Sequence, residues 1–129
     1  ADAVGEHALM AAKDDLGRAG ESRAATYLTD LGFEIVDRNW RSGRGELDLV
    51  ARDAETIVVV EVKTRSDDAF GDPLFAVDRR KYDRLWRLAL ARRQDHPVSA
   101  IGRRLRVDLI GITGPDPRTG RLDHLEDVC

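Results

Sequence analysis

The sequence contains few of the residues that crosslink or anchor small proteins. Its single cysteine, Cys129, excludes an intrachain disulfide and a zinc site built on cysteines. The three histidines are scattered at spacings that fit no metal site, so we expect them on the surface. No apolar run is long enough to span a bilayer, and residues 1–12 lack the basic segment of a secretory signal. These absences predict a cytoplasmic protein.

The length and composition predict one compact unit. The 129 residues suit a single domain, 1–129, in which residues 1–15 form a loose N-terminal extension. Hydrophobic residues make up 42% of the chain, which is enough for a core. The charged fraction of 35% exceeds the roughly 25% of average chains and indicates a soluble surface.

Apolar periodicity and turn residues predict an α/β domain. Helices are expected at about 16–31 and 74–94, with a turn at 97–102, and strands at about 33–40, 46–51, 56–63, 105–112 and 122–128. The short link at 52–55 makes the second and third strands a hairpin. The segment 56–63 is almost wholly apolar before Glu61, so it should lie centrally, while 122–128 should be an edge strand. This order predicts a central mixed sheet flanked by helices.

One constellation of charged residues falls on the predicted hairpin. Side chains alternate along a strand, so Glu61 and Lys63 share a face, and Asp48 on the partner strand can lie opposite or diagonal to them. Mg²⁺ or Mn²⁺ would be held by the carboxylates of Asp48 and Glu61 and by the carbonyl of Val62, because such hard cations prefer oxygen ligands. Lys63 would then hydrogen-bond the attacking water or the scissile phosphate of a phosphodiester.

The alternative interpretation of this constellation is an ordinary, weak cross-strand ion pair. The charges follow four consecutive β-branched residues, however, where a buried charge is costly unless it is paired or used. Asp108 lies in a later apolar strand and fits a buried acid paired with an arginine. Glu21 lies near the start of the first helix, where the helix dipole alone would favour a glutamate.

The charge distribution favours a polyanionic partner. The net charge of −3 alone argues against nucleic acid. Residues 76–106, however, hold ten basic and three acidic side chains, a local charge of +7 that leaves −10 for the remainder. An acidic metal-binding part beside a basic part suits an enzyme acting on a polyanion, although charge runs are usually solvated helix faces. The candidate phosphate contacts are Arg41, Ser42, Arg65, Arg79, Arg80, Lys81 and Arg84.

Several motifs together resemble the YraN-like bacterial proteins, over most of the chain from about residue 16 to 112. They are Gly17-x-x-Gly20-Glu21-x-x-Ala24, Leu31-Gly32-Phe33, Arg38-Asn39-Trp40-Arg41, Gly45-Glu46-Leu47-Asp48-Leu49-Val50, Val60-Glu61-Val62-Lys63-Thr64-Arg65, Phe70-Gly71, Ala76-Val77-Asp78 and Lys81. The resemblance implies a restriction-endonuclease-like core of the PD-(D/E)xK superfamily, similar to archaeal Holliday-junction resolvases. The proline of that superfamily's name is replaced here by Leu47.

The resemblance also implies roles for individual residues. Asp48, Glu61 and a helical glutamate, Glu21, match the family's metal ligands, and Lys63 matches its lysine. The implied activity is an Mg²⁺- or Mn²⁺-dependent DNA endonuclease acting on branched or junction DNA. Resolvases of this kind act as homodimers, although no dimerisation motif stands out in the sequence. The competing hypotheses are a non-catalytic nucleic-acid-binding module and a protein-interaction domain on the same scaffold.

Overall fold

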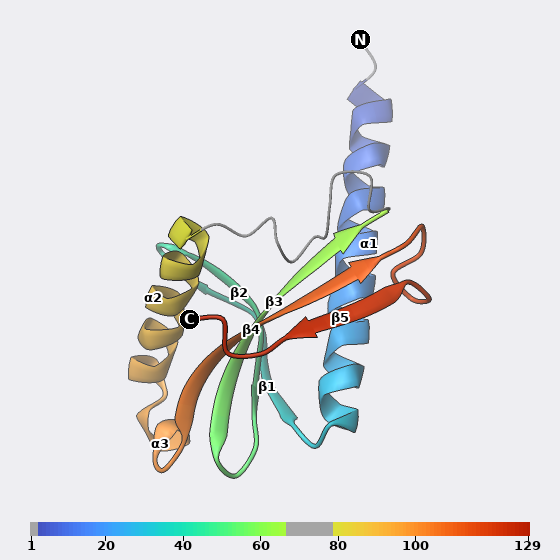
Figure 1. The fold of residues 1–129 in the computed structure, drawn as a ribbon. Helices are drawn as coiled ribbons and strands as arrows, with labels where there is room; N and C mark the ends of the chain where they lie inside the picture. The colour runs from blue at the N-terminus through green and yellow to red at the C-terminus, as the bar shows by residue number, and fades with distance from the viewer. Residues whose placement is uncertain (1–2, 67–78) are drawn as a thin grey trace.

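The computed structural model describes the backbone of residues 3–66 and 79–129, and side chains from residue 15 onward. One five-stranded sheet has the order β1-β2-β3-β4-β5 (Figure 1). Its strands are β1 (Glu34–Ser42), β2 (Gly45–Arg52), β3 (Thr56–Arg65), β4 (Arg104–Thr113) and β5 (Arg121–Leu125). The helices are α1 (Ala3–Asp30), α2 (Arg79–Asp95) and the short α3 (Pro97–Ala100). This is the predicted α/β class, with a mixed sheet flanked by helices, and it is consistent with a restriction-endonuclease-like core.

The pairing of the strands makes β3 the centre of the sheet. β1 with β2, β2 with β3, and β4 with β5 are antiparallel, whereas β3 and β4 are parallel. The predicted hairpin, the central position of residues 56–63 and the edge position of the last strand are therefore confirmed. The last strand ends at Leu125, earlier than predicted.

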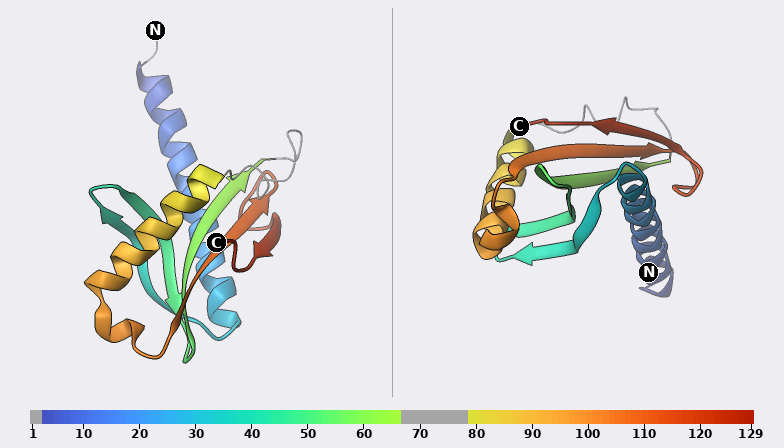
Figure 2. Two further views of the ribbon diagram at one scale, coloured as in Figure 1. Left: turned by 60° about the vertical axis from the view of Figure 1, so that its left-hand side comes forward. Right: turned by 90° about the horizontal axis from the view of Figure 1, so that it is seen from below.

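Each face of the sheet is covered by one long helix, as the views in Figure 2 show. Alternate residues of β3 enter two separate cores. Val58 and Val60 pack with Ala24 and Leu28 of α1, whereas Ile57 and Val59 pack with Leu85, Leu88 and Ala89 of α2. Burial on both faces explains why β3 is a continuous apolar run rather than an alternating one.

The helices differ from the prediction in two places. α1 begins at Ala3 rather than near residue 16, because its first residues are mostly good helix formers although their apolar periodicity is weak. Residues 97–100 form the short helix α3 within the turn predicted at 97–102; Pro97 at its start fits the first position of a helix. Residues 74–78 of the second predicted helix lie outside the described residues, and the rest is α2.

A glycine allows α1 to approach the sheet closely. A Cβ atom on Gly20 would lie 2.3 Å from Cγ2 of Thr64 in β3, closer than two such atoms can come. The threonine side chain is short and β-branched, so it has little freedom to move away. Gly20 therefore sets the position of the helix segment that carries Glu21.

Replacing Gly20 by alanine is expected to lower the free energy of unfolding by about 1–3 kcal/mol, because the overpacking forces α1 away from β3. Gly17→Ala is the matched control, since its Cβ would meet nothing within 4 Å. That control should gain up to about 1 kcal/mol from helix propensity. Chemical denaturation of both variants measures the difference, and equal stability would contradict the close approach.

Candidate active site where strands β2 and β3 separate

Strands β2 and β3 part at the point where the predicted acids lie. Their paired register ends at Leu49 opposite Val60, so the next facing positions are Asp48 and Glu61. The Asp48 carboxylate accepts a hydrogen bond from the backbone N–H of Val62 at 2.8 Å through Oδ2, in place of a backbone acceptor. The strands therefore separate around two facing carboxylates, as the alternation along the hairpin predicted.

The backbone of β2 also changes its facing direction here. Leu47 packs in the α2 core and Leu49 in the α1 core, although regular alternation would place both on one face. The change occurs at Asp48. As a result, the opening between the strands lies within reach of charged side chains from both long helices.

The two carboxyl groups share a crowded and partly buried space. The pKa of Asp48 is raised to about 7, first by burial and then by the neighbouring charges of Glu61, Glu21 and Glu46, whereas the hydrogen bond from the Val62 N–H lowers it. Burial also raises the pKa of Glu61, which is opposed by Lys81, Lys63 and Arg84 and by a hydrogen bond with Asp48. Near neutral pH the pair therefore tends to keep one proton, which a cation would displace.

Lys63 lies beside a second lysine. Its hydrogen bond with Lys81 of α2, followed by burial and the charge of Lys81, lowers the pKa of Lys63 to about 8, whereas Glu61 acts in the opposite direction. Glu61 and Lys63 each shift the pKa of the other, which is consistent with the prediction that they share one face of the strand. An ammonium with a lowered pKa can exchange a proton with water near neutral pH.

Glu21 approaches from α1 and is held by an unexpected residue. With its amide nitrogen turned toward the acids, Asn39 donates to Glu46 Oε1 at 2.7 Å and to Glu21 Oε2 at 3.3 Å. Asn39 has a φ of 53°, a left-handed conformation that is uncommon in a strand and that asparagine tolerates better than most residues. Burial raises the pKa of Glu21, while Asn39, Arg38 and Arg18 lower it.

The donor set suits a hard divalent cation. Mg²⁺ commonly takes one or two carboxylates and completes its shell with water and phosphate oxygens, which matches Asp48 and Glu61. Among the described residues, no group of three or more His, Cys, Asp or Glu side chains converges on one metal position. Glu21 as a third ligand stays a prediction, as does the Val62 carbonyl; Val62 contributes its N–H to Asp48.

The predicted phosphate contacts fall in three places. Lys81 and Arg84 act on Glu61 from α2, while Arg79 and Arg80 are exposed on the first turn of that helix. Arg41 pairs with Glu46 at 3.2 Å and Ser42 accepts from the N–H of Arg44, both near the β1–β2 turn. Arg65 ends β3 and lines a hollow with Gly114 and Pro115. The structure therefore brings the α2 residues closest to the acids.

Asp108 is a buried acid, as predicted, but its partners extend beyond arginine. It accepts two hydrogen bonds from Arg106 at 2.9 Å, one from the N–H of Asp127 at 2.9 Å, and contacts His124 Nε2 at 2.7 Å. His124 also contacts the hydroxyl of Tyr27 on α1 at 3.0 Å. The expectation that the histidines lie on the surface is wrong for His124, whose side chain is 6% exposed, and it is confirmed for His96. His7 lies outside the described side chains.

Sequence reasoning missed Asn39 and Glu46 as members of this site. The available signal was the asparagine itself, a turn-favouring residue within a predicted strand. Arg92, which was counted in the basic segment, is buried and lies 3.7 Å from Asp37. It is therefore unavailable to a phosphate, whereas its helical neighbour Arg93 is exposed.

The sequence is similar to bacterial proteins of one family. A UPF0102 protein of Paenarthrobacter aurescens is 45% identical over 121 residues, covering 94% of this chain and 98% of that protein. One from Beutenbergia cavernae is 48% identical over 119 residues, covering 92% and 99%. One from Streptomyces coelicolor is 43% identical over 127 residues, covering 98% and 97%.

Two further findings concern the helices and the family of the chain. No helix in the described part is both long enough and apolar enough to cross a bilayer. The model of the family described as "Uncharacterised protein family UPF0102" matches residues 20–112, a span that includes Glu21, Asp48, Glu61 and Lys63. The chain therefore belongs to the UPF0102 family.

Proposed function

We propose that this protein is a metal-dependent DNA endonuclease of the PD-(D/E)xK type. The observation that carries the proposal is the pair of facing carboxylates, Asp48 and Glu61, at the opening between β2 and β3, with Lys63 and Lys81 beside them. A merely structural ion pair would not need two neighbouring acids whose pKa values are both raised by burial, with the charge of Glu61 raising that of Asp48 further. Carboxyl groups perturbed in this way are typical of sites that bind or react.

The residues divide the chemistry of phosphodiester hydrolysis among them. Asp48 and Glu61 would hold Mg²⁺ or Mn²⁺, which supplies charge neutralisation at the phosphate and polarises water. Lys63, with a pKa of about 8, hydrogen-bonds the attacking water and receives its proton when the lysine is neutral. Lys81 and Arg84 place positive charge where the phosphate would lie. Asn39 hydrogen-bonds Glu21, whose carboxylate adds a further negative charge close to Asp48.

The proposal is tested by incubating the protein with labelled four-way-junction, flap, duplex and single-stranded DNA. Parallel reactions contain Mg²⁺, Mn²⁺ or a chelator. Cleavage that requires a divalent ion and prefers one of the branched substrates is the expected result. Binding without cleavage of any substrate under any metal condition would instead favour a non-catalytic nucleic-acid-binding module, and absence of binding would contradict both.

Divalent ions are also expected to stabilise the protein itself. An ion at ten times its Kd adds about 1.4 kcal/mol to the free energy of unfolding, or roughly 3–6 °C in Tm, because it binds only the folded site. Glu61→Gln should abolish this shift, whereas Glu55→Gln in the exposed β2–β3 turn should retain it. Thermal melts with and without Mg²⁺ or Mn²⁺ measure the effect without requiring activity. An equal shift in the two variants would place the ion elsewhere.

A further inference from the structure

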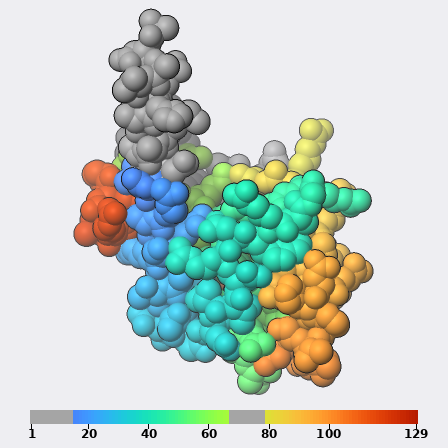
Figure 3. Space-filling model, turned by 180° about the vertical axis from the view of Figure 1, so that it is seen from behind, coloured from blue at the N-terminus to red at the C-terminus, as the bar shows by residue number. Residues whose placement is uncertain are grey.

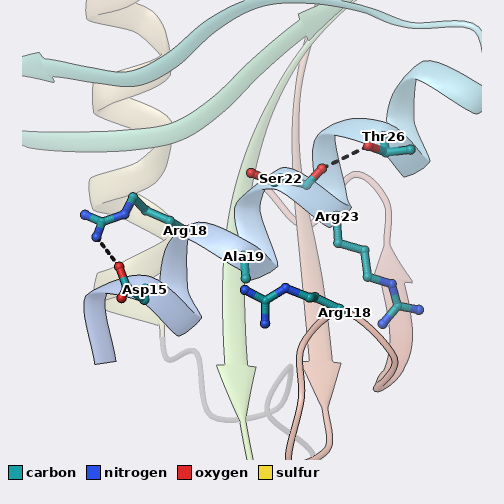
Figure 4. A pocket seen from close by; sticks show the side chains of 7 residues that line it. All are labelled: Asp15, Arg18, Ala19, Ser22, Arg23, Thr26 and Arg118. Atoms are coloured by element: carbon teal, nitrogen blue, oxygen red, sulfur yellow. Dashed lines mark hydrogen bonds and ion pairs between the residues drawn. The ribbon is translucent and has the colours of Figure 1, made fainter. Parts of the chain in front are cut away.

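A second group of basic residues lies on the outer side of α1, away from the acids. It lines a hollow of about 550 Å³ between α1 and the connection from β4 to β5 (Figure 4). Arg18, Arg23 and Arg118 surround this hollow, and the small side chain of Ala19 leaves room between them. The hydroxyl-bearing residues Ser22 and Thr26 also line it. None of these residues was among the predicted phosphate contacts.

The arginines hold the hollow in shape and retain free donors. Arg23 donates through NH1 to the carbonyl oxygens of Pro117, at 3.0 Å, and of Gly120, which ties the connection to α1. Arg18 pairs with Asp15, the one acidic residue among the described side chains that line the hollow, and Arg118 pairs with Asp116 at 3.3 Å. A guanidinium has five N–H donors, so a single surface carboxylate leaves several of them for another anion.

The hollow is linked to the candidate active site through α1. Arg38 of β1 donates to the hydroxyl of Ser22 at 3.1 Å, and Arg38 and Arg18 both act electrostatically on Glu21. Figure 3 shows α1, in blue, between the β1–β2 hairpin and the β4–β5 connection on one face of the molecule. Positive charge therefore extends from the hairpin across α1 to Arg118, on the opposite side of the acids from the basic residues of α2.

We propose that Arg18, Arg23 and Arg118 form a subsite for a backbone phosphate of the nucleic acid, and that one duplex arm of the substrate lies across α1. The proposal rests on the function inferred above and extends it. Guanidinium and hydroxyl groups around an open hollow are the donors that protein surfaces use to position a phosphate backbone without reading its sequence. A substrate that contacts both α1 and α2 must extend to both sides of the scissile bond.

The test measures binding separately from cleavage. Duplex and four-way-junction DNA are titrated by fluorescence anisotropy in a chelator at several salt concentrations. Arg18→Gln and Arg118→Gln are compared with Arg104→Gln, at the start of β4. The three side chains have matching exposures of 66%, 65% and 66%, and each pairs with one aspartate. The three substitutions therefore remove the same charge from similar surface environments.

Arg18→Gln and Arg118→Gln are each expected to weaken binding about 3- to 10-fold and to reduce the slope of log K against log salt by about 1. Arg104→Gln should leave both quantities close to those of the wild type. Equal effects of all three substitutions would overturn the subsite while leaving the proposed nuclease intact. Wild-type protein that binds neither DNA would overturn both proposals.

Discussion

Asp48→Asn is expected to reduce metal-dependent DNA cleavage by about 10²- to 10³-fold, because a bound cation contributes several kcal/mol to such a reaction and each 1.36 kcal/mol is a factor of ten. An amide has nearly the same shape as the carboxylate, and its oxygen can still accept the hydrogen bond from the Val62 N–H. The substitution therefore removes the negative charge while preserving the local backbone. The rate of cleavage at saturating metal measures the effect.

The same substitution is expected to stabilise the metal-free protein. The pKa of Asp48 is about 7 in the fold and 3.8 as the reference value, so the fold favours its protonated form. Stability is therefore lost as pH rises from about 4 through 7, where the unfolded chain ionises more readily than the native site. Asp48→Asn should gain about 1–2 kcal/mol near pH 8 and nothing near pH 4.

The exposed Asp30 at the end of α1 provides the matched control, since Asp30→Asn makes the same chemical change outside the site. It should alter neither cleavage nor the pH dependence of unfolding. Lower activity combined with higher stability identifies a charge retained for function at the expense of the fold. If Asp48→Asn were instead less stable at pH 8 with unchanged cleavage, the carboxylate would be an ordinary structural group.

The sheet and the central acids were accessible from the sequence because both depend on short-range regularities. Four consecutive β-branched residues predicted that β3 is buried on two faces, and the period of two along a strand put Glu61 and Lys63 together. The turn between β2 and β3 fixed the register that places Asp48 opposite Glu61. Each of these steps needed only local pattern and pairing geometry.

The remainder of the site depends on contacts between distant segments. Asn39 joins the site because its left-handed backbone turns the side chain toward both Glu46 and Glu21, and Glu21 arrives only when α1 packs on the sheet. Lys81 lowers the pKa of Lys63 because α2 covers the other face. No periodicity in the sequence encodes the distance between two helices on opposite faces of a sheet.

The misplacement of His124 has the same cause. Its burial depends on the register that sets it opposite Ile110 and on Tyr27 of α1, whose ring lies edge-on at a centroid distance of 5.4 Å. An edge strand usually exposes polar side chains, so a histidine there is expected in solvent. The acid on the neighbouring strand, Asp108, supplies the partner that makes burial favourable.

Asp108→Asn is expected to lower the free energy of unfolding at pH 7 by about 3–5 kcal/mol, because it removes the buried partner of Arg106 and leaves that cation with the more exposed Glu126 at 3.9 Å. The carboxylate is fully buried, and its two oxygens receive four contacts, from Arg106, His124 and the N–H of Asp127. An asparagine replaces one of these acceptor oxygens by a donor. Asp123→Asn on β5 is the control, since its ion pair with Arg121 lies at the surface and should contribute at most about 1 kcal/mol.

The pH dependence separates loss of charge from loss of shape. Burial raises the pKa of Asp108, but the hydrogen bonds from His124, Arg106 and the N–H of Asp127 outweigh it and hold the pKa below 3.8. The stabilisation is therefore present above that value and is lost as pH falls through the folded pKa. The difference between wild type and Asp108→Asn should be largest at about pH 5–7 and should shrink below about pH 4.

A second substitution then identifies the origin of the loss. Replacing Arg106 by methionine in the Asp108→Asn background removes the cation that has lost its buried partner, and it should recover part of the stability because a buried pair is often replaceable by apolar groups. Recovery would show that the loss comes from the guanidinium deprived of its buried carboxylate; no recovery would assign it to the contacts of His124 and the Asp127 N–H. The contact between His124 of β5 and Tyr27 of α1 keeps both of its partners in the double variant, so below its melting temperature this variant should still position Glu21 and retain cleavage.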